Sequence, residues 1–271
     1  MAHISTYTQA EASCFTGQES GKNYCLRVAV NRKNEMTTKA IITILPFLFS
    51  SIVAISQTYK STEFVETKAP EISSPDWYHL NYSKHNFEVR NVDGGLQIFK
   101  AEDKQQCELT IKGGTLIGTD NGEWGGKLIY KPNHKPDDTI KIKAGNILSI
   151  FHLNNKIYFI EGLAHGVLSE GALFELEYSK KKFRYKKVLA FDDAPAALAL
   201  HKDRILIASH RNFYIIKDLK KEFVFKDAFW SSLYPNSIAV MDDSNIYLGI
   251  RGGIVKLDLE SKTLKFLKYN P

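Results

Sequence analysis

Ser237-Ile-Ala-Val-Met-Asp-Asp-Ser-Asn-Ile-Tyr-Leu-Gly-Ile-Arg-Gly-Gly-Ile-Val-Lys-Leu-Asp258 gives the clearest indication of the fold. Its apolar residues alternate with polar or small ones in short runs, the period of a half-buried strand. The runs predict strands at 237–241, 246–250 and 253–257, and the next run predicts a fourth strand at 263–267. Asp, Asn, Ser and Gly separate the runs and suit tight hairpins, so a four-stranded antiparallel sheet is expected.

A similar strand ending recurs along the chain. The segments 115–120, 157–161, 205–210 and 246–251 end at intervals of 41, 49 and 41 residues, a spacing typical of β-propeller blades. Each segment is preceded by one alternating run and followed by two more. The repeat therefore predicts an all-β fold, a β-propeller of four-stranded antiparallel blades.

Five blades are expected, four of them clear and one partial. The clear blades cover residues 106–143, 147–190, 196–226 and 237–267. The partial blade lies upstream, with its third and fourth strands expected at 87–92 and 96–99 and its second at Tyr78–Tyr82. A three-stranded first blade would close the ring.

The repeat resembles those of secreted bacterial β-propeller proteins, including NHL-type repeats and the extracellular propellers of sensor kinases. The segment 116–122 resembles the same element as 237–258. The resemblance covers residues 106–271 and implies the propeller fold. It says little about function, because such repeats serve many unrelated roles. The chain lacks the Trp-Asp dipeptide of WD-type propellers.

The N-terminal part of the chain contains an apolar stretch at 40–54, preceded by Lys39. It is short for a membrane span and suits the core of a secretory signal peptide. Ala54 and Ser56 are small residues at positions −3 and −1 before Gln57, as signal peptidase requires. Cleavage there predicts a secreted or periplasmic protein with no stable membrane insertion. The alternative is an anchor that stays in the membrane.

These features divide the chain into four parts. Residues 1–35 are expected to be an unstructured extension or the product of a misassigned start, and 36–56 the signal peptide. Residues 57–75 are polar, contain two prolines and predict a linker. The propeller is then expected at 76–271.

The charge of the chain is weakly basic, at +6 over 271 residues. Its densest basic run, 180–187, alternates with aromatic residues and predicts a strand. The run fits either a solvated edge strand, where lysine blocks edge-to-edge pairing, or an anion-binding stripe. We expect no nucleic-acid partner, and we expect a monomer.

Three cysteines are present, and two of them, Cys14 and Cys25, precede the signal peptide. Only Cys107 would remain after cleavage, which excludes an internal disulfide framework and a cysteine-rich metal site. Its alternating surroundings predict a buried structural role in a strand rather than a nucleophile.

Candidate ligand-binding residues come from one face of the expected propeller. This b–c face carries the loops between the second and third strands of each blade and the links between blades. Strand ends, the longer 161–169 loop and the links contribute Asp120, Glu161, His165, Asp192, His210, Trp230, Tyr234 and Arg251. Polar groups that converge beside aromatic rings suit a ligand site, although each residue also fits an ordinary turn, and Trp230 also fits a wedge between blades.

Two functions from different classes fit this face. The first is an exported binding module for a small molecule, glycan or protein. The second is a small lactonase-like hydrolase or lyase that uses His165, His210 and Glu161, with a divalent metal as a possible aid if Asp192 joins them. No motif predicts a cofactor, and no close pair of histidines predicts a metal site. A purely structural interaction domain is a third possibility.

Overall fold

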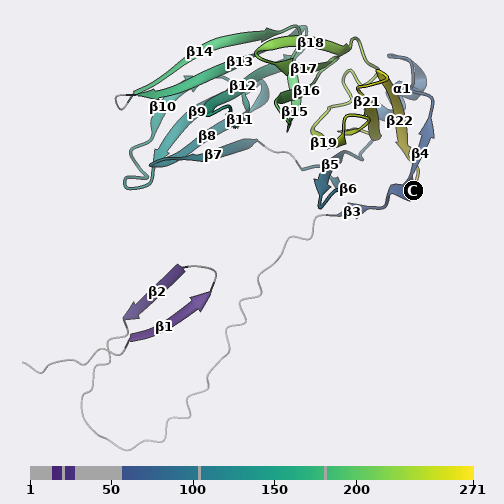
Figure 1. Ribbon diagram of the computed structural model, residues 1–271. Helices are drawn as coiled ribbons and strands as arrows, with labels where there is room; N and C mark the ends of the chain where they lie inside the picture. The colour runs from purple at the N-terminus through teal and green to yellow at the C-terminus, as the bar shows by residue number, and fades with distance from the viewer. Residues whose placement is uncertain (1–13, 20–21, 28–56, 103–104, 180–181) are drawn as a thin grey trace, which may run out of the picture. The chain divides into compact units, whose positions relative to one another are not determined.

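The computed structural model describes residues 14–19, 22–27, 57–102, 105–179 and 182–271. The chain divides into two compact units, Met1–Val53 and Ala54–Pro271. The all-β class is confirmed, since the described residues form strands with one short α-helix (Figure 1). No helix within these ranges has the length and apolar character needed to cross a membrane.

The first unit contains a hairpin of β1 (Cys14–Glu19) and β2 (Lys22–Arg27), which pair antiparallel. Residues 1–35 were expected to lack structure, and the described part of them instead forms these two strands. The predicted signal peptide at 36–56 lies outside the described residues.

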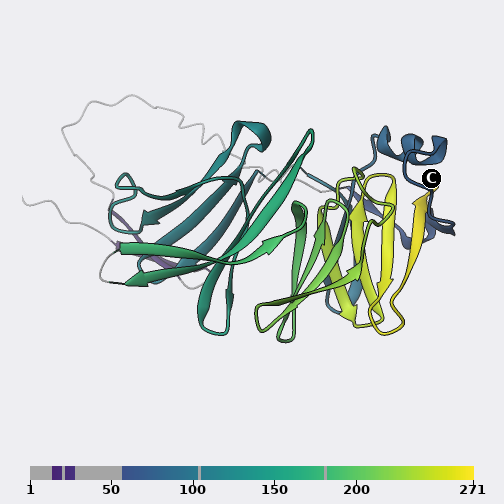
Figure 2. The same cartoon turned by 90° about the horizontal axis from the view of Figure 1, so that it is seen from above.

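Four sheets of the second unit repeat the predicted meander, in which four consecutive strands of the chain pair in order (Figure 2). The β7–β10 sheet contains β7 (Gln106–Ile111), β8 (Gly114–Asp120), β9 (Gly126–Pro132) and β10 (Ile140–Ala144). The β11–β14 sheet contains β11 (Ile147–Leu153), β12 (Lys156–His165), β13 (Leu168–Ser179) and β14 (Lys182–Phe191). The expected long loop after residue 161 is therefore an extension of the β12–β13 hairpin.

Two further sheets follow along the chain. The β15–β18 sheet contains β15 (Pro195–His201), β16 (Arg204–Ser209), β17 (Phe213–Lys217) and β18 (Lys220–Phe225). The β19–β22 sheet contains β19 (Ser237–Asp242), β20 (Asn245–Ile250), β21 (Gly253–Asp258) and β22 (Thr263–Tyr269). The predicted strands of all four clear blades are thus confirmed to within a few residues.

The segment upstream of β7 differs from the prediction. β5 (Phe87–Val92) and β6 (Gly95–Lys100) pair with each other, and β3 (Thr58–Tyr59) adds to β6. β5 packs against β19 and β20, so it is the innermost strand of this three-stranded sheet rather than its third.

The linker prediction for 57–75 is wrong, because this segment supplies strands to two sheets. Besides β3, it forms the 3-10 turn η1 (Ser61–Glu63) and then β4 (Phe64–Thr67), which pairs with β22 as a fifth strand. The folded unit therefore begins before residue 76. Hydrogen bonding between β4, near the start of this unit, and its last strand β22 ties the two ends of the unit together.

The predicted strand at Tyr78–Tyr82 is also wrong, since Pro75–Asn81 forms helix α1. Ser74 caps the helix by accepting the Trp77 backbone N–H at 3.2 Å, and Pro75 stands in the first turn, where its missing N–H costs nothing. The buried Trp77 indole donates to the Phe229 carbonyl at 2.9 Å. This buried contact fixes the short helix on the b–c face.

Packing between consecutive sheets forms the core. Four buried hydrophobic clusters lie between neighbouring sheets, in the order β7–β10, β11–β14, β15–β18, β19–β22 and β3–β6–β5. Strand β16 illustrates this packing. Five of its six residues are buried, because both of its faces meet a neighbouring sheet. Among the described residues, none of these clusters joins the β3–β6–β5 sheet to the β7–β10 sheet.

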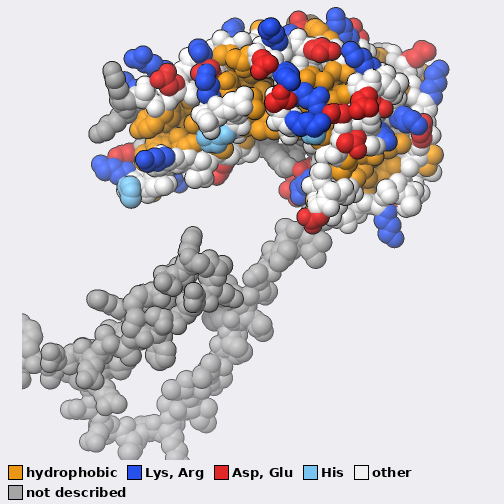
Figure 3. Space-filling view, in the orientation of Figure 1, with side chains coloured by type: hydrophobic (Ala, Val, Ile, Leu, Met, Phe, Trp, Pro, Cys, Tyr) orange, Lys and Arg blue, Asp and Glu red, His pale blue; other side chains and the backbone are white. Residues whose placement is uncertain are grey.

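Charged side chains of both signs are intermingled on the visible face of the second unit (Figure 3). Strand β14, which holds the described part of the basic run, is the outermost strand of its sheet, and Lys186 lies 3.4 Å from the Glu175 carboxylate. Ion pairs of this kind offset the local positive charge, which fits the solvated edge strand better than the anion-binding stripe.

Candidate functional site

The strand register shows which b–c face residues are equivalent in neighbouring sheets. The backbone N–H groups of Asp120, Gly162 and His210 each donate to the carbonyl of the residue just before the first strand of their own sheet, at 2.9, 3.2 and 2.8 Å. Asp120 and His210 are therefore equivalent, as predicted. In the β11–β14 sheet the equivalent residue is Gly162. Glu161 stands one residue before it, so its side chain points to the opposite side of the sheet, because side chains alternate along a strand.

Asp120, His165, His210 and Tyr234 line one pocket of about 460 Å³ on the b–c face. This size falls in the range of small-molecule sites. The rest of its wall combines glycine backbone with apolar side chains, among them Gly122, Gly162, Leu163, Leu168 and Pro195. We call it the b–c pocket. It brings together half of the predicted ligand-binding residues.

His210 is a partly buried ionisable group of the b–c pocket. Burial lowers the pKa of its imidazole below the usual value, the Asp193 carboxylate opposes this shift, and Arg211 adds to it. This shift favours the neutral form of the ring. Its Nε2 lies 3.4 Å from the Ser232 hydroxyl, which also lines the pocket.

Tyr234 presents a half-exposed ring at the pocket mouth. The Arg251 guanidinium lies over this ring at 4.1 Å from its centroid, and Arg251 in turn donates to the Asn81 carbonyl at 2.8 Å. A cation over one face of the ring holds its orientation and leaves the other face for a ligand. Arg251 thus acts on the site through Tyr234, and it lines an adjoining cavity of about 570 Å³ rather than the b–c pocket.

His165 extends the pocket toward the loop tips. It stands at the end of β12, where its Nε2 lies 3.2 Å from the Glu123 carboxylate in the 3-10 turn η2 (Gly122–Trp124). Trp124 follows with 85% of its surface exposed. The His165–Glu123 contact joins loops of two neighbouring sheets beside this exposed aromatic ring.

Glu161 does not join the two histidines. It lines a separate pocket of about 370 Å³ and forms an ion pair with Lys143. The predicted catalytic set of His165, His210 and Glu161 is therefore not assembled in one place. The one-residue offset in the repeat accounts for this separation.

Two other predicted ligand residues lie outside the b–c pocket. Trp230 is fully buried, and its indole N–H lies 3.3 Å from the Ser209 carbonyl, so it is the wedge between sheets and cannot contact a ligand. Asp192 is exposed and forms an ion pair with Lys221 on β18. Its side chain therefore points along the sheet edge.

The neighbour of Asp192 carries the strongest polar network of the b–c face. Asp193 is fully buried and accepts hydrogen bonds of 2.6 to 2.8 Å from Ser209, the Arg211 backbone, Asn212 and Tyr214. Burial and this carboxylate raise the pKa of the Tyr214 hydroxyl. In the sequence, Asp193 stands just before the first strand of its sheet. Ser209, Asn212 and Tyr214 lie in or beside the turn between the second and third strands. All bonds of the network stay within the protein, so its role is structural.

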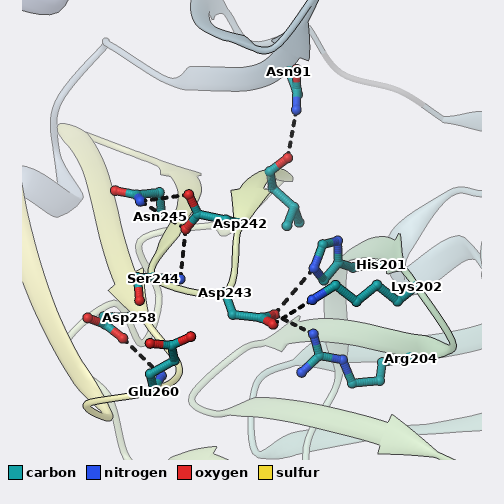
Figure 4. A network of polar contacts seen from close by, with 11 residues as sticks. Asn91, His201, Lys202, Arg204, Asp242, Asp243, Ser244, Asn245, Asp258 and Glu260 are labelled. Carbon is teal, nitrogen blue, oxygen red and sulfur yellow. Dashed lines mark hydrogen bonds and ion pairs between the residues drawn. The ribbon is translucent and has the colours of Figure 1, made fainter.

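The opposite face holds an ion-pair cluster in the turns between first and second strands (Figure 4). Asp243 lies 2.8 Å from Lys202 and 3.3 Å from His201, and it also contacts Arg204. The hydrogen bond from Lys202 and the bond and charge of Arg204 lower the pKa of Asp243 to about 2. This cluster joins the β15–β18 and β19–β22 sheets across their turns.

Cys107 has the predicted strand position and is partly buried. It lies in β7, and burial raises the pKa of its thiol to about 11, which keeps it protonated and unreactive. Within the described ranges, no group of three or more His, Cys, Asp or Glu residues has a geometry that could hold a metal ion.

No family model matches the chain, and no curated protein matches it. Solved structures similar to it include the computationally designed Ika4 protein, with 10% identity and a TM-score of 0.35, over 63% of this chain and 94% of that one. The computationally designed Ika8 protein shares 10% identity with a TM-score of 0.36, over 68% of this chain and 56% of that one. The chain thus spans about half the length of Ika8.

Proposed function

We propose that the chain is an exported five-bladed β-propeller that binds a small molecule, glycan or protein segment in the b–c pocket. The convergence of Asp120, His210 and Tyr234 in this pocket carries the proposal. Asp120 ends β8, His210 follows β16 and Tyr234 lies in the link before β19, and all three residues line one pocket. Polar side chains that converge in a pocket of this size beside an aromatic ring are a usual feature of a ligand site.

Closure of the sheets into a ring is part of the proposal. A second cavity of about 570 Å³ is lined from the first strands of four sheets and from the segment before β19. Inner strands around a common cavity are the arrangement of a propeller. Asp120 and Tyr234 line both this cavity and the b–c pocket, so the pocket would open onto the central channel.

The backbone supports a binding role for the loop that carries Tyr234. Ser232 and Tyr234 both have left-handed backbones, with φ of 58° and 53°. Non-glycine residues in this region carry strain, and such residues gather at ligand sites. Buried neighbours such as Leu233 hold the loop in place.

The binding proposal is tested by screening the secreted protein against mono- and disaccharides and short peptides, with ligand-observed NMR as the readout. Tyr234→Ala and Asp120→Asn are expected to weaken any hit at least tenfold. Tyr82→Ala is the matched control, because this exposed tyrosine lies outside the pocket. Hits that all three variants bind equally well would place the ligand elsewhere and contradict the proposal.

Export is tested separately by intact mass and N-terminal sequencing of the protein from a secreting host. An N-terminus at Gln57 is the expected result. Retention of residues 1–56 would contradict the signal peptide.

A further inference from the structure

Ser232 and His210 form a contact that neither the binding proposal nor the core requires. The Ser232 hydroxyl lies 3.4 Å from His210 Nε2, and both residues line the b–c pocket. His210 follows β16, and Ser232 lies in the link between β18 and β19, 22 positions further along the chain. A hydroxyl beside an imidazole is the pairing that activates serine as a nucleophile, and such contacts are often longer before substrate binds.

The backbone holds Ser232 in an unusual conformation. Its φ of 58° is left-handed, a strained conformation for serine. The Ser232 carbonyl accepts a hydrogen bond of 2.7 Å from the Asn81 amide on helix α1. The strained backbone is therefore fixed from outside its own loop, while the hydroxyl remains directed at His210. Reactive serines are commonly presented on strained turns of this kind.

The surroundings of His210 favour the neutral base. Asp193 and Arg211 are the charged groups that act on its ring, and burial outweighs the effect of the Asp193 carboxylate. A neutral imidazole protonated at Nδ1 has a free Nε2, which can accept the Ser232 proton. The backbone N–H of His210 donates to the Ala194 carbonyl at 2.8 Å, which fixes the residue at the end of its strand.

We propose that Ser232 is a nucleophile and His210 its general base, and that the b–c pocket hydrolyses small carboxylic esters. The inference rests on the proposed function, because it requires the pocket to bind a ligand. The apolar wall of Leu163, Leu168 and Pro195 suits an acyl chain. The carboxylate of Asp120 in the same pocket disfavours a phosphate or carboxylate substrate, since like charges repel.

The reaction balances with water as the co-substrate. Ser232 Oγ attacks the ester carbonyl carbon while its proton passes to His210 Nε2. The bond from that carbon to the alkoxide oxygen breaks, and the alkoxide takes the proton from His210 as it leaves as an alcohol. Water, deprotonated by His210, then attacks the acyl-serine. The carboxylic acid is released, and Ser232 regains its proton.

A fluorophosphonate probe, followed by mass spectrometry of peptides from the intact chain, tests the inference. An adduct on Ser232 is expected, and the chain should hydrolyse p-nitrophenyl acetate faster than buffer alone. Ser232→Ala should lose both properties. His210→Gln should slow labelling by about 10²-fold or more, the usual contribution of a general base. Ser261→Ala, in an exposed turn outside the pocket, is the matched control and should behave as the parent.

Two results would overturn the inference. One is the absence of a Ser232 adduct in protein whose circular dichroism melt is cooperative. The other is an adduct that forms equally fast in His210→Gln. If the pocket still binds a ligand in the NMR screen and Tyr234→Ala weakens it, the binding proposal stands and only the catalytic inference fails.

Discussion

The carboxylate of Glu161 occupies the space that a side chain at Gly145 would need. A Cβ built on Gly145 would lie 2.6 Å from Glu161 Cδ, and the φ of Gly145 is +139°. In the next sheet the equivalent pair is Asp193 and Ser209, where the carboxylate comes from the link and a small side chain from the strand. Both sheets therefore have one carboxylate at this position. In the first sheet the second strand supplies it, and in the next sheet the link before the first strand supplies it.

Gly145→Ala should destabilise the protein by about 2–4 kcal/mol, because the new Cβ meets the Glu161 carboxylate and the backbone is strained for alanine. Urea unfolding followed by circular dichroism measures the change. Gly166→Ala is the control, since its φ is also positive at +59° but no atom lies within 4 Å of the new Cβ. Equal losses in the two variants would show that the Glu161 contact does not matter.

Asp193→Asn should cost about 2–4 kcal/mol of unfolding free energy, because an amide cannot accept all the hydrogen bonds that the buried carboxylate accepts. The adjacent variant Asp192→Asn removes an ion pair whose aspartate is 55% exposed, so it should cost less than about 1 kcal/mol. The two variants are compared by the same urea unfolding experiment. A loss for Asp192→Asn as large as for Asp193→Asn would contradict the structural role of Asp193.

Asp243 should stabilise the protein in a defined pH range. Its pKa in the folded protein is lowered from 3.8 to about 2, so the stabilisation is fully present above about pH 4 and is lost as the pH falls toward 2. Parent and Asp243→Asn should differ by about 2 kcal/mol at pH 6 and converge near pH 2. The groups that face Asp243 are His201, Lys202 and Arg204. A difference that stays constant from pH 6 to pH 2 would argue against this ion-pair cluster.

The β3–β6–β5 and β7–β10 sheets each pack one face on a neighbouring sheet. Ring closure should bring their other two faces together. Stacked sheets lie about 10 Å apart. Spin labels at Gln97 on β6 and Thr115 on β8 should then give one narrow, short distance in a pulsed electron resonance experiment. A broad or long distribution would show an open row of sheets instead of a closed propeller.

Strand positions could be predicted from the sequence because each blade has strong local signals. In 237–269, apolar residues alternate and Asp, Asn or Gly stands at each turn, and the four strands appear within a few residues of the predicted ends. The strand position of Cys107 was predicted correctly for the same reason. The predicted strand at Tyr78–Tyr82 is wrong because Ser74 and Pro75 start a helix there, and the segment is too short for helical periodicity to appear in the sequence.

The candidate site was only partly predictable. Asp120 and His210 follow from the repeat, since equivalent strand ends reach the same face. Glu161 was misplaced because a one-residue shift in register turns a side chain to the other side of a sheet, and the intervals in the sequence are not exact enough to detect it. Ser232 gave no signal, because its left-handed backbone depends on contacts with distant elements.

The sequence by itself determined the all-β class, the repeated meander and most strand ends, because alternation and turn residues act between neighbours in the chain. Only the tertiary structure decided that β4 pairs with β22, that Trp230 is buried and that Tyr234 stays exposed under Arg251. The physical reason is that burial and pairing across long sequence separations depend on which surfaces meet. Local residue patterns do not contain that information.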